Sequence, residues 1–299
     1  MSKSLLKMAS GNRLPHGRGS VSTRKRAVTN LSRAREQAVF GLFQQAAKWR
    51  LAILPALAIS LGAQTPLQNI GKPIRVLYEC TAEDLQAAGI GCSEEDPCPI
   101  YLELSNVDAV GLKIFVTGNL HTSMVTLDSI LLASEDSGGT WLEPHPRLRS
   151  TGLDQIQFVD SQNGWISGAN LQTAPRDPFF LITSDGGKTW RERPLFEETR
   201  VAAIESFWFD TPSNGTLLLD ARLDNGKHEL YQTHTGGESW AIQQSSEKPL
   251  HAVKAKPADT LGWRVRTDAA THSYVIEKAE NNRWQKVASF LVNIASCKE

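Results

Sequence analysis

The chain has 299 residues and equal numbers of basic and acidic side chains, 32 Lys and Arg against 32 Asp and Glu, so its formal net charge is zero. The charges are unevenly distributed, because the first 50 residues contain 11 bases and one acid and the remainder contains 21 bases and 31 acids. An acidic main part of this length can bury a substantial core, and it excludes a broad basic surface for nucleic acid outside the first 50 residues.

Residues 1–50 are a basic leader without apolar periodicity. The compact basic run Arg24-Lys25-Arg26 is the pattern of a nucleic-acid-binding arm. The leader is also too long for the basic region of a signal peptide, which favours a translation start downstream, at Val39 if its codon is GTG. We therefore expect the leader to be absent from the mature protein, and we expect no nucleic-acid partner.

Residues 51–63 are predicted to form the core and cleavage region of a secretory signal peptide. The basic flank Lys48-Trp49-Arg50 precedes an apolar run that ends in the small residues Gly62-Ala63. The run is too short for a comfortable transmembrane helix, and an uncleaved anchor is the alternative. We expect cleavage after Ala63, export to the periplasm or the medium, and membrane contact only through this segment if it stays uncleaved.

Residues 64–104 are predicted to hold a strand over 74–78 and a short helix. Thr81 and Asp84 have the spacing of a capping box, and Gly89 is placed to end the helix. This segment forms a preface to the repeated part of the chain, residues 105–299.

The four cysteines all lie after the predicted signal segment. An even number of cysteines in an oxidising compartment favours two disulfides. Of the three possible pairings, Cys92–Cys98 closes a short loop, and Cys80–Cys297 then ties the preface to the end of the chain. No Cys-x-x-Cys pair or nearby His indicates a metal site, so we expect neither a metal nor a cofactor.

One eight-residue pattern occurs three times in residues 105–299. It reads SEDSGGTW, TSDGGKTW and THTGGESW, and it ends at Trp141, Trp190 and Trp240. These tryptophans lie 49 and 50 residues apart, and a worn fourth copy ends at Trp284. A fixed period of this length with short strands predicts the blades of a β-propeller.

Each copy has the residues of a tight β-hairpin turn. Gly supplies positive φ, Asp and Ser or Thr accept or donate hydrogen bonds in the turn, and Trp provides a large apolar body to bury. We expect structural roles for Ser134, Asp136, Gly138 and Trp141, for Thr183, Asp185, Gly187 and Trp190, and for Thr233, Gly237 and Trp240. In the third copy Thr235 replaces the aspartate.

These turns resemble the Asp-box, or BNR, repeat of sialidase-like β-propellers. An apolar strand and a Gly-Trp pair such as Gly164-Trp165 precede the turns, and this fuller pattern resembles the photosystem II stability and assembly factor family over roughly residues 105–290. The resemblance implies an all-β propeller of about four four-stranded blades and a non-catalytic role in assembly. Whether four blades close a ring alone or need a partner stays open.

A sialidase would also need an arginine triad, a Tyr nucleophile with a carboxylate, and an acid/base Asp. The Arg-Ile-Pro motif of those enzymes is missing ahead of the first turn, although the pairs Tyr101/Glu103 and Tyr231/Glu229 could each share a strand face. We therefore expect an exported, non-enzymatic protein that binds another protein or an extracellular glycan. The alternative is a sialidase-like glycoside hydrolase or a glycan-binding propeller.

Loops on the face opposite the repeated turns are the expected place for a ligand. Four arginines in these loops, Arg147, Arg149, Arg176 and Arg200, are the candidate binding residues, because together they could dock a carboxylate or an acidic segment. The alternative is that they are solvated loop charges.

Overall fold

The computed structural model describes residues 65–172, 174–250 and 262–298. The predicted leader, the signal segment and its cleavage site lie outside these residues. Within the described part, no helix is long and apolar enough to cross a membrane.

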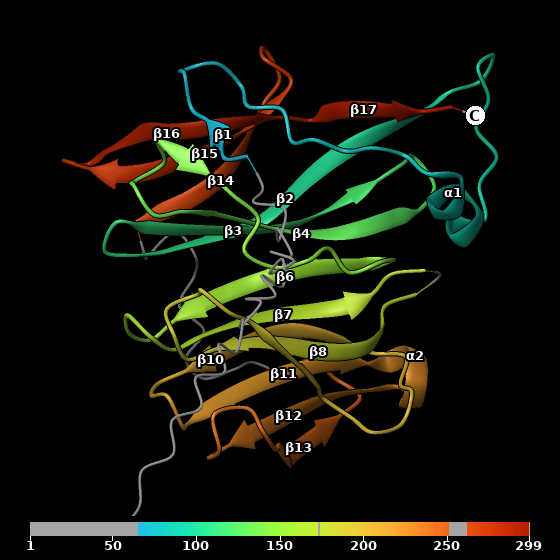
Figure 1. Ribbon diagram of the computed structural model, residues 1–299. Helices are drawn as coiled ribbons and strands as arrows, with labels where there is room; N and C mark the ends of the chain where they lie inside the picture. Colours follow the sequence, from blue (N-terminus) through green and yellow to red (C-terminus); the bar gives the residue numbers. More distant parts are fainter. Residues whose placement is uncertain (1–64, 173, 251–261, 299) are drawn as a thin grey trace, which may run out of the picture. The chain divides into compact units, whose positions relative to one another are not determined.

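The described residues form antiparallel β-sheets with two short helices (Figure 1). The elements are β1 (Leu67–Gln68), α1 (Ala82–Ala88), β2 (Cys98–Val110), β3 (Lys113–His121), β4 (Thr126–Ser134), β5 (Thr140–Trp141), β6 (Thr151–Phe158), β7 (Gly164–Asn170), β8 (Arg176–Thr183), β9 (Arg191–Pro194), β10 (Ala203–Phe209), β11 (Gly215–Ala221), α2 (Arg222–Asn225), β12 (Lys227–Thr233), β13 (Ala241–Ser246), β14 (Trp263–Asp268), β15 (Ser273–Glu280), β16 (Arg283–Leu291) and β17 (Asn293–Cys297).

The larger sheets are the blades of an all-β propeller, as the repeat period predicted. Their strand orders are β17-β2-β3-β4 in blade 1, β6-β7-β8-β9 in blade 2, β10-β11-β12-β13 in blade 3 and β14-β15-β16 in blade 4. A separate two-stranded sheet pairs β1 with β5.

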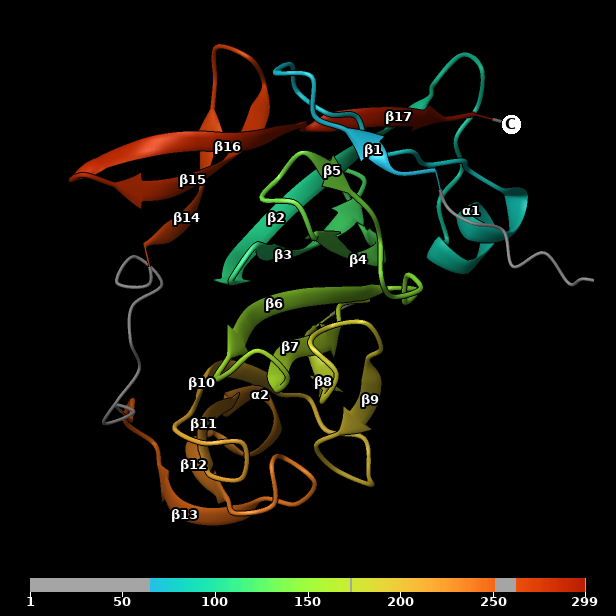
Figure 2. The ribbon, with the colours of Figure 1, turned by 60° about the vertical axis from the view of Figure 1, so that its left-hand side comes forward.

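The last strand of the chain belongs to the first blade. β17 pairs with β2, with Cys297 opposite Cys98, and both figures show the two strands side by side (Figure 2). The chain contains the disulfides Cys80–Cys297 and Cys92–Cys98. Because β17 pairs with β2, blade 4 has three described strands rather than the four that the repeat predicted.

The preface to the blades matches its prediction in the helix but not in the strand. Thr81 caps α1, where it accepts a hydrogen bond from the Asp84 N–H, and Gly89 ends the helix in the left-handed conformation. The predicted strand over 74–78 forms only one β-bridge, between Ile74 and Phe290. This segment instead contributes β1. That strand pairs with β5, which begins at Thr140, directly after the first repeated turn.

The repeated turns are held by their own side chains. The Asp185 carboxylate accepts hydrogen bonds from Lys188 N–H and Thr189 N–H, both at 3.0 Å, and Thr183 Oγ1 donates to it at 2.8 Å. In the third copy the Thr235 hydroxyl accepts from Ser239 N–H at 3.0 Å. The third copy therefore keeps the turn with a shorter, uncharged acceptor.

Apolar side chains pack between neighbouring blades. Phe115 of blade 1 stacks on Phe158 of blade 2, and Trp165 of blade 2 stacks on Phe209 of blade 3 at 3.8 Å between ring centroids. Gly187 must be glycine, because its φ is +81° and an added Cβ would lie 2.4 Å from the Phe115 ring. The repeated turn of blade 2 thus packs directly against blade 1.

Candidate functional site

The strands β2, β6 and β10, one from each of blades 1, 2 and 3, share an irregularity in their pairing with the next strand. The pairing register shifts between Leu104 and Asn106 in β2, between Leu153 and Ile156 in β6, and between Ile204 and Ser206 in β10. A β-bulge takes a residue out of the ladder and redirects its side chain, and bulges are common beside active sites. Each bulge contains an exposed residue, namely Ser105, Asp154 or Glu205, and the β6 bulge also contains the half-buried Gln155.

A cavity of about 290 Å³ opens beside the first two bulges, and we call it the interblade cavity. It is lined by Glu103, Ser105 and Asn119 of blade 1, by Gly152, Leu153, Asp154, Ser167, Gly168 and Ala169 of blade 2, by Leu171 and Pro175 of the loop after β7, and by Ala203 and Ile204 of blade 3. Its volume is near the lower end of the about 300–1,000 Å³ that small-molecule sites occupy.

Two carboxyl groups from neighbouring blades line the interblade cavity. Glu103 accepts a hydrogen bond from the Asn119 side-chain amide at 3.1 Å, which orients its carboxylate. Burial raises the pKa of Asp154 above its usual range, and the negative charge of Glu103 adds to the rise. Asp154 remains exposed to solvent and lines the cavity on the side of blade 2.

The backbone around these groups is also held in place. The Thr117 hydroxyl donates a hydrogen bond to the Asp154 carbonyl, which links β3 to the bulge of β6. The pKa of Tyr274 is raised by burial and then by the charge of Glu103, so its phenol lies within the electrostatic reach of this carboxylate. Burial favours the protonated form of Asp154, and a protonated acid close to a second carboxyl group is a common arrangement for paired acid and base roles.

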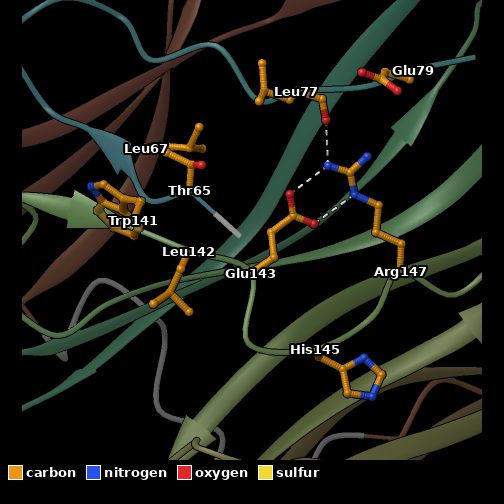
Figure 3. A pocket seen from close by; sticks show the side chains of 9 residues that line it. All are labelled: Thr65, Leu67, Leu77, Glu79, Trp141, Leu142, Glu143, His145 and Arg147. Atoms are coloured by element: carbon orange, nitrogen blue, oxygen red, sulfur yellow. Dashed lines mark hydrogen bonds and ion pairs between the residues drawn. The ribbon is translucent and has the colours of Figure 1, made fainter. Parts of the chain in front are cut away.

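A larger cavity, of about 650 Å³, lies between residues 65–79 and the loop after β5. Figure 3 shows its main charged groups, Glu143 and Arg147, directed at one another. Arg147 donates to both Glu143 carboxylate oxygens, at 2.7 and 2.8 Å, and to the Leu77 carbonyl at 2.8 Å. Glu143 and Arg147 neutralise each other's charge and fill each other's hydrogen bonds. They are therefore less available to a ligand than the carboxyl groups of the smaller interblade cavity.

The structure places the four predicted arginines in two groups. Arg149 pairs with Glu83 and Asp84 of α1, at 3.0 and 3.1 Å, close to the Arg147 pair described above. Arg147 is not the solvated loop charge of the alternative interpretation, because its side chain is largely buried.

The other two arginines lie on neighbouring backbone segments of blades 2 and 3. Arg176 begins β8, and the next residue donates its N–H to the Arg200 carbonyl at 2.8 Å. Arg200 pairs with Asp224 at 2.8 Å and Glu229 at 3.1 Å, and its guanidinium lies 4.5 Å from the centre of the Phe196 ring. Acids of the chain itself therefore engage Arg147, Arg149 and Arg200, which leaves the carboxyl pair as the stronger site.

Sequence reasoning identified Glu103, as the neighbour of Tyr101, but not Asp154. The available signal was that Asp154-Gln155 interrupts the alternation of an otherwise half-buried strand. In the described residues, no group of three or more His, Cys, Asp or Glu side chains is arranged to hold a metal ion.

No protein-family model matches the chain. A curated relative, an oligoxyloglucan-reducing end-specific xyloglucanase from Emericella nidulans, is 27% identical over 121 residues, which is 38% of this chain. The chain covers only 14% of the length of that relative.

Several solved structures match part of the chain at low identity and low TM-score. YCF48 bound to D1 peptide is 14% identical with a TM-score of 0.37, and the match covers 66% of this chain and 58% of that chain. The GH74 xyloglucanase from Xanthomonas campestris is 14% identical with a TM-score of 0.34, and the match covers 62% of this chain and 28% of that chain.

The comparisons correct one expectation from the sequence. The prediction of a non-enzymatic protein is contradicted, because the curated relative is a xyloglucanase. The chain is therefore an all-β propeller whose detected sequence similarity, over 121 residues, is to a xyloglucanase.

Proposed function

We propose that the protein is an exported Asp-box propeller that binds a glycan in the interblade cavity and hydrolyses a glycosidic bond there. The observation that carries the proposal is that Glu103 on β2 of blade 1 and Asp154 on β6 of blade 2 line one cavity. The 27% identity to a xyloglucanase over 121 residues supports a carbohydrate substrate, and the two disulfides support an oxidising compartment.

The two carboxyl groups have distinct proposed roles. Asp154, whose protonated form is favoured by burial and by the charge of Glu103, donates a proton to the glycosidic oxygen. Glu103, oriented by Asn119, stabilises the positive charge that develops on the sugar ring and acts on the opposite side of the bond, as base or nucleophile. Ser105 and Ser167 supply hydroxyl groups for hydrogen bonds to the sugar.

The lining of the cavity also indicates the class of sugar. None of the described residues that line it is a Lys or Arg, whereas a sugar carboxylate requires a cationic partner in a buried site. Two acidic groups without a cation would repel a sialic acid or a uronic acid. We therefore propose a polysaccharide of neutral sugars, such as xyloglucan, as the substrate.

The test is the release of reducing ends from xyloglucan and other neutral polysaccharides by the purified protein. Asp154→Asn and Glu103→Gln should each lower kcat on the order of 10²–10⁴-fold. Wild-type activity should also fall as the pH rises through the pKa of Asp154, because the acid must carry its proton. Glu192→Gln, on the exposed strand β9, is the matched control and should keep wild-type activity. No release of reducing ends, or full activity of the Asp154→Asn variant, would contradict the proposal.

A further inference from the structure

A second cavity continues from the interblade cavity toward α2. It has a volume of about 340 Å³, and we call it the α2 cavity. It is lined by Pro175, Val201, Ala202, Ala203, Asp220, Arg222 and Leu223. Pro175 and Ala203 also line the interblade cavity, so the two cavities adjoin along the loop before β8 and the start of β10.

The far wall of the α2 cavity presents an apolar side chain on a rigid support. Leu223 lies on α2, which is only four residues long, and its side chain is 74% exposed. Its neighbour Asp224 is held by Arg200, and Asn225 donates to the Glu229 carboxylate at 2.7 Å. The same Arg200 binds Glu229, so α2 is fixed to β12 by a charged network on which Leu223 is displayed.

The rim of the α2 cavity carries a paired acid and base. The Arg222 guanidinium donates to both oxygens of Asp220, at 2.9 and 2.7 Å. Hydrogen bonds from Arg222 lower the pKa of Asp220 to about 2, so the pair stays ionised at all working pH values. The side chain of Arg222 remains 60% exposed, which leaves guanidinium N–H groups directed at solvent.

We infer that the α2 cavity is a second subsite for the same glycan chain, so that the protein binds internal stretches of a long neutral polysaccharide rather than its terminal sugar. This inference rests on the proposed function. The Leu223 side chain covers the apolar face of a sugar ring, and the Asp220–Arg222 pair binds its hydroxyl groups. Because the subsite lies beside the carboxyl pair, only chains long enough to reach both cavities gain from it.

The experiment compares binding of a short and a long neutral oligosaccharide, a xyloglucan disaccharide core and a fragment several backbone sugars longer, by titration calorimetry. Leu223→Ser should weaken binding of the long oligosaccharide about tenfold, since it loses most of one buried leucine contact. Binding of the short oligosaccharide should change less than about twofold. Leu112→Ser removes a similarly exposed leucine (67%, against 74% for Leu223) from the turn between β2 and β3 and is the matched control.

Each outcome separates the two proposals. If the wild type binds neither oligosaccharide, both the proposed function and the second subsite are contradicted. If the wild type binds both, and Leu223→Ser leaves the preference for the long oligosaccharide unchanged, only the second subsite is overturned. A loss of the preference in Leu112→Ser as well would show a general effect on the fold and would also overturn it.

Discussion

Among single residues, Asp108 shows how the blades are joined. It is buried between blades 1 and 2, where its carboxylate accepts hydrogen bonds from Phe158 N–H at 2.7 Å and from Ala109 N–H at 2.8 Å. In the next interface Gln157 accepts from Phe209 N–H and donates to its carbonyl. The Gln157 amide can accept from the backbone N–H and donate to the backbone carbonyl, whereas the ionised Asp108 carboxylate can only accept.

This difference predicts a pH-dependent stability. Burial raises the pKa of Asp108 from about 3.8 to about 6, so the folded protein binds more protons than the unfolded chain between these values. The contribution of Asp108 is full below pH 4 and is lost as the pH rises through 6, by about 3 kcal/mol. We expect the free energy of unfolding of the wild type, measured by urea denaturation, to fall by this amount relative to that of Asp108→Asn between pH 4 and 7. A difference independent of pH would contradict the assignment.

At the scale of the element, the repeated turns differ in how deeply the tryptophan at the end of each turn is buried. Trp141 is fully buried, packs edge-on against Phe290 at 5.2 Å and donates its indole N–H to the Gly138 carbonyl. Trp190 is only half-buried, against Phe115 and Phe158. The first turn is covered by β1 and by blade 4, which the second turn lacks.

The two tryptophans should therefore contribute unequally to stability. Trp141→Ala is expected to lower the free energy of unfolding by about 3–5 kcal/mol, as for a fully buried aromatic side chain. Trp190→Ala should lower it by about half as much, because part of its surface already contacts water. Chemical denaturation of the two variants measures both values, and equal losses would show that burial does not set the contribution.

At the scale of the whole molecule, the disulfides close loops of very different length. Cys80–Cys297 spans 217 residues and ties the preface to β17, whereas Cys92–Cys98 spans six. Cross-linking restricts the unfolded chain more when the loop is longer. The long disulfide also keeps β17 in blade 1, next to the strand that bears Glu103.

Removing the two disulfides should thus have different effects. Loop entropy alone predicts a loss of about 5 kcal/mol for Cys80→Ser with Cys297→Ser, and about 2 kcal/mol for Cys92→Ser with Cys98→Ser. Thermal unfolding of the two double variants under non-reducing conditions tests this order. A larger loss from the short loop would show that local strain or packing outweighs loop entropy.

Local patterns in the sequence were sufficient for much of the fold. The turn residues and their period predicted propeller blades, because each hairpin is stabilised by groups that lie within eight residues of one another. The cap at Thr81 and the short-loop pair Cys92–Cys98 are equally local. The strand over 74–78 was wrong for the converse reason, since its pairing depends on the distant Phe290.

The sequence by itself determined the features that depend on neighbouring residues along the chain. These are the all-β class, the blade repeat and the turns. Only the tertiary structure brought Asp154 beside Glu103, because the two lie on different blades and meet through a bulge whose register depends on the partner strand. It alone also showed which acids engage Arg149 and Arg200, at separations of 66 and 29 residues. The pKa values and ion pairs of side chains so far apart in the sequence depend on tertiary packing, and composition and residue spacing do not encode that packing.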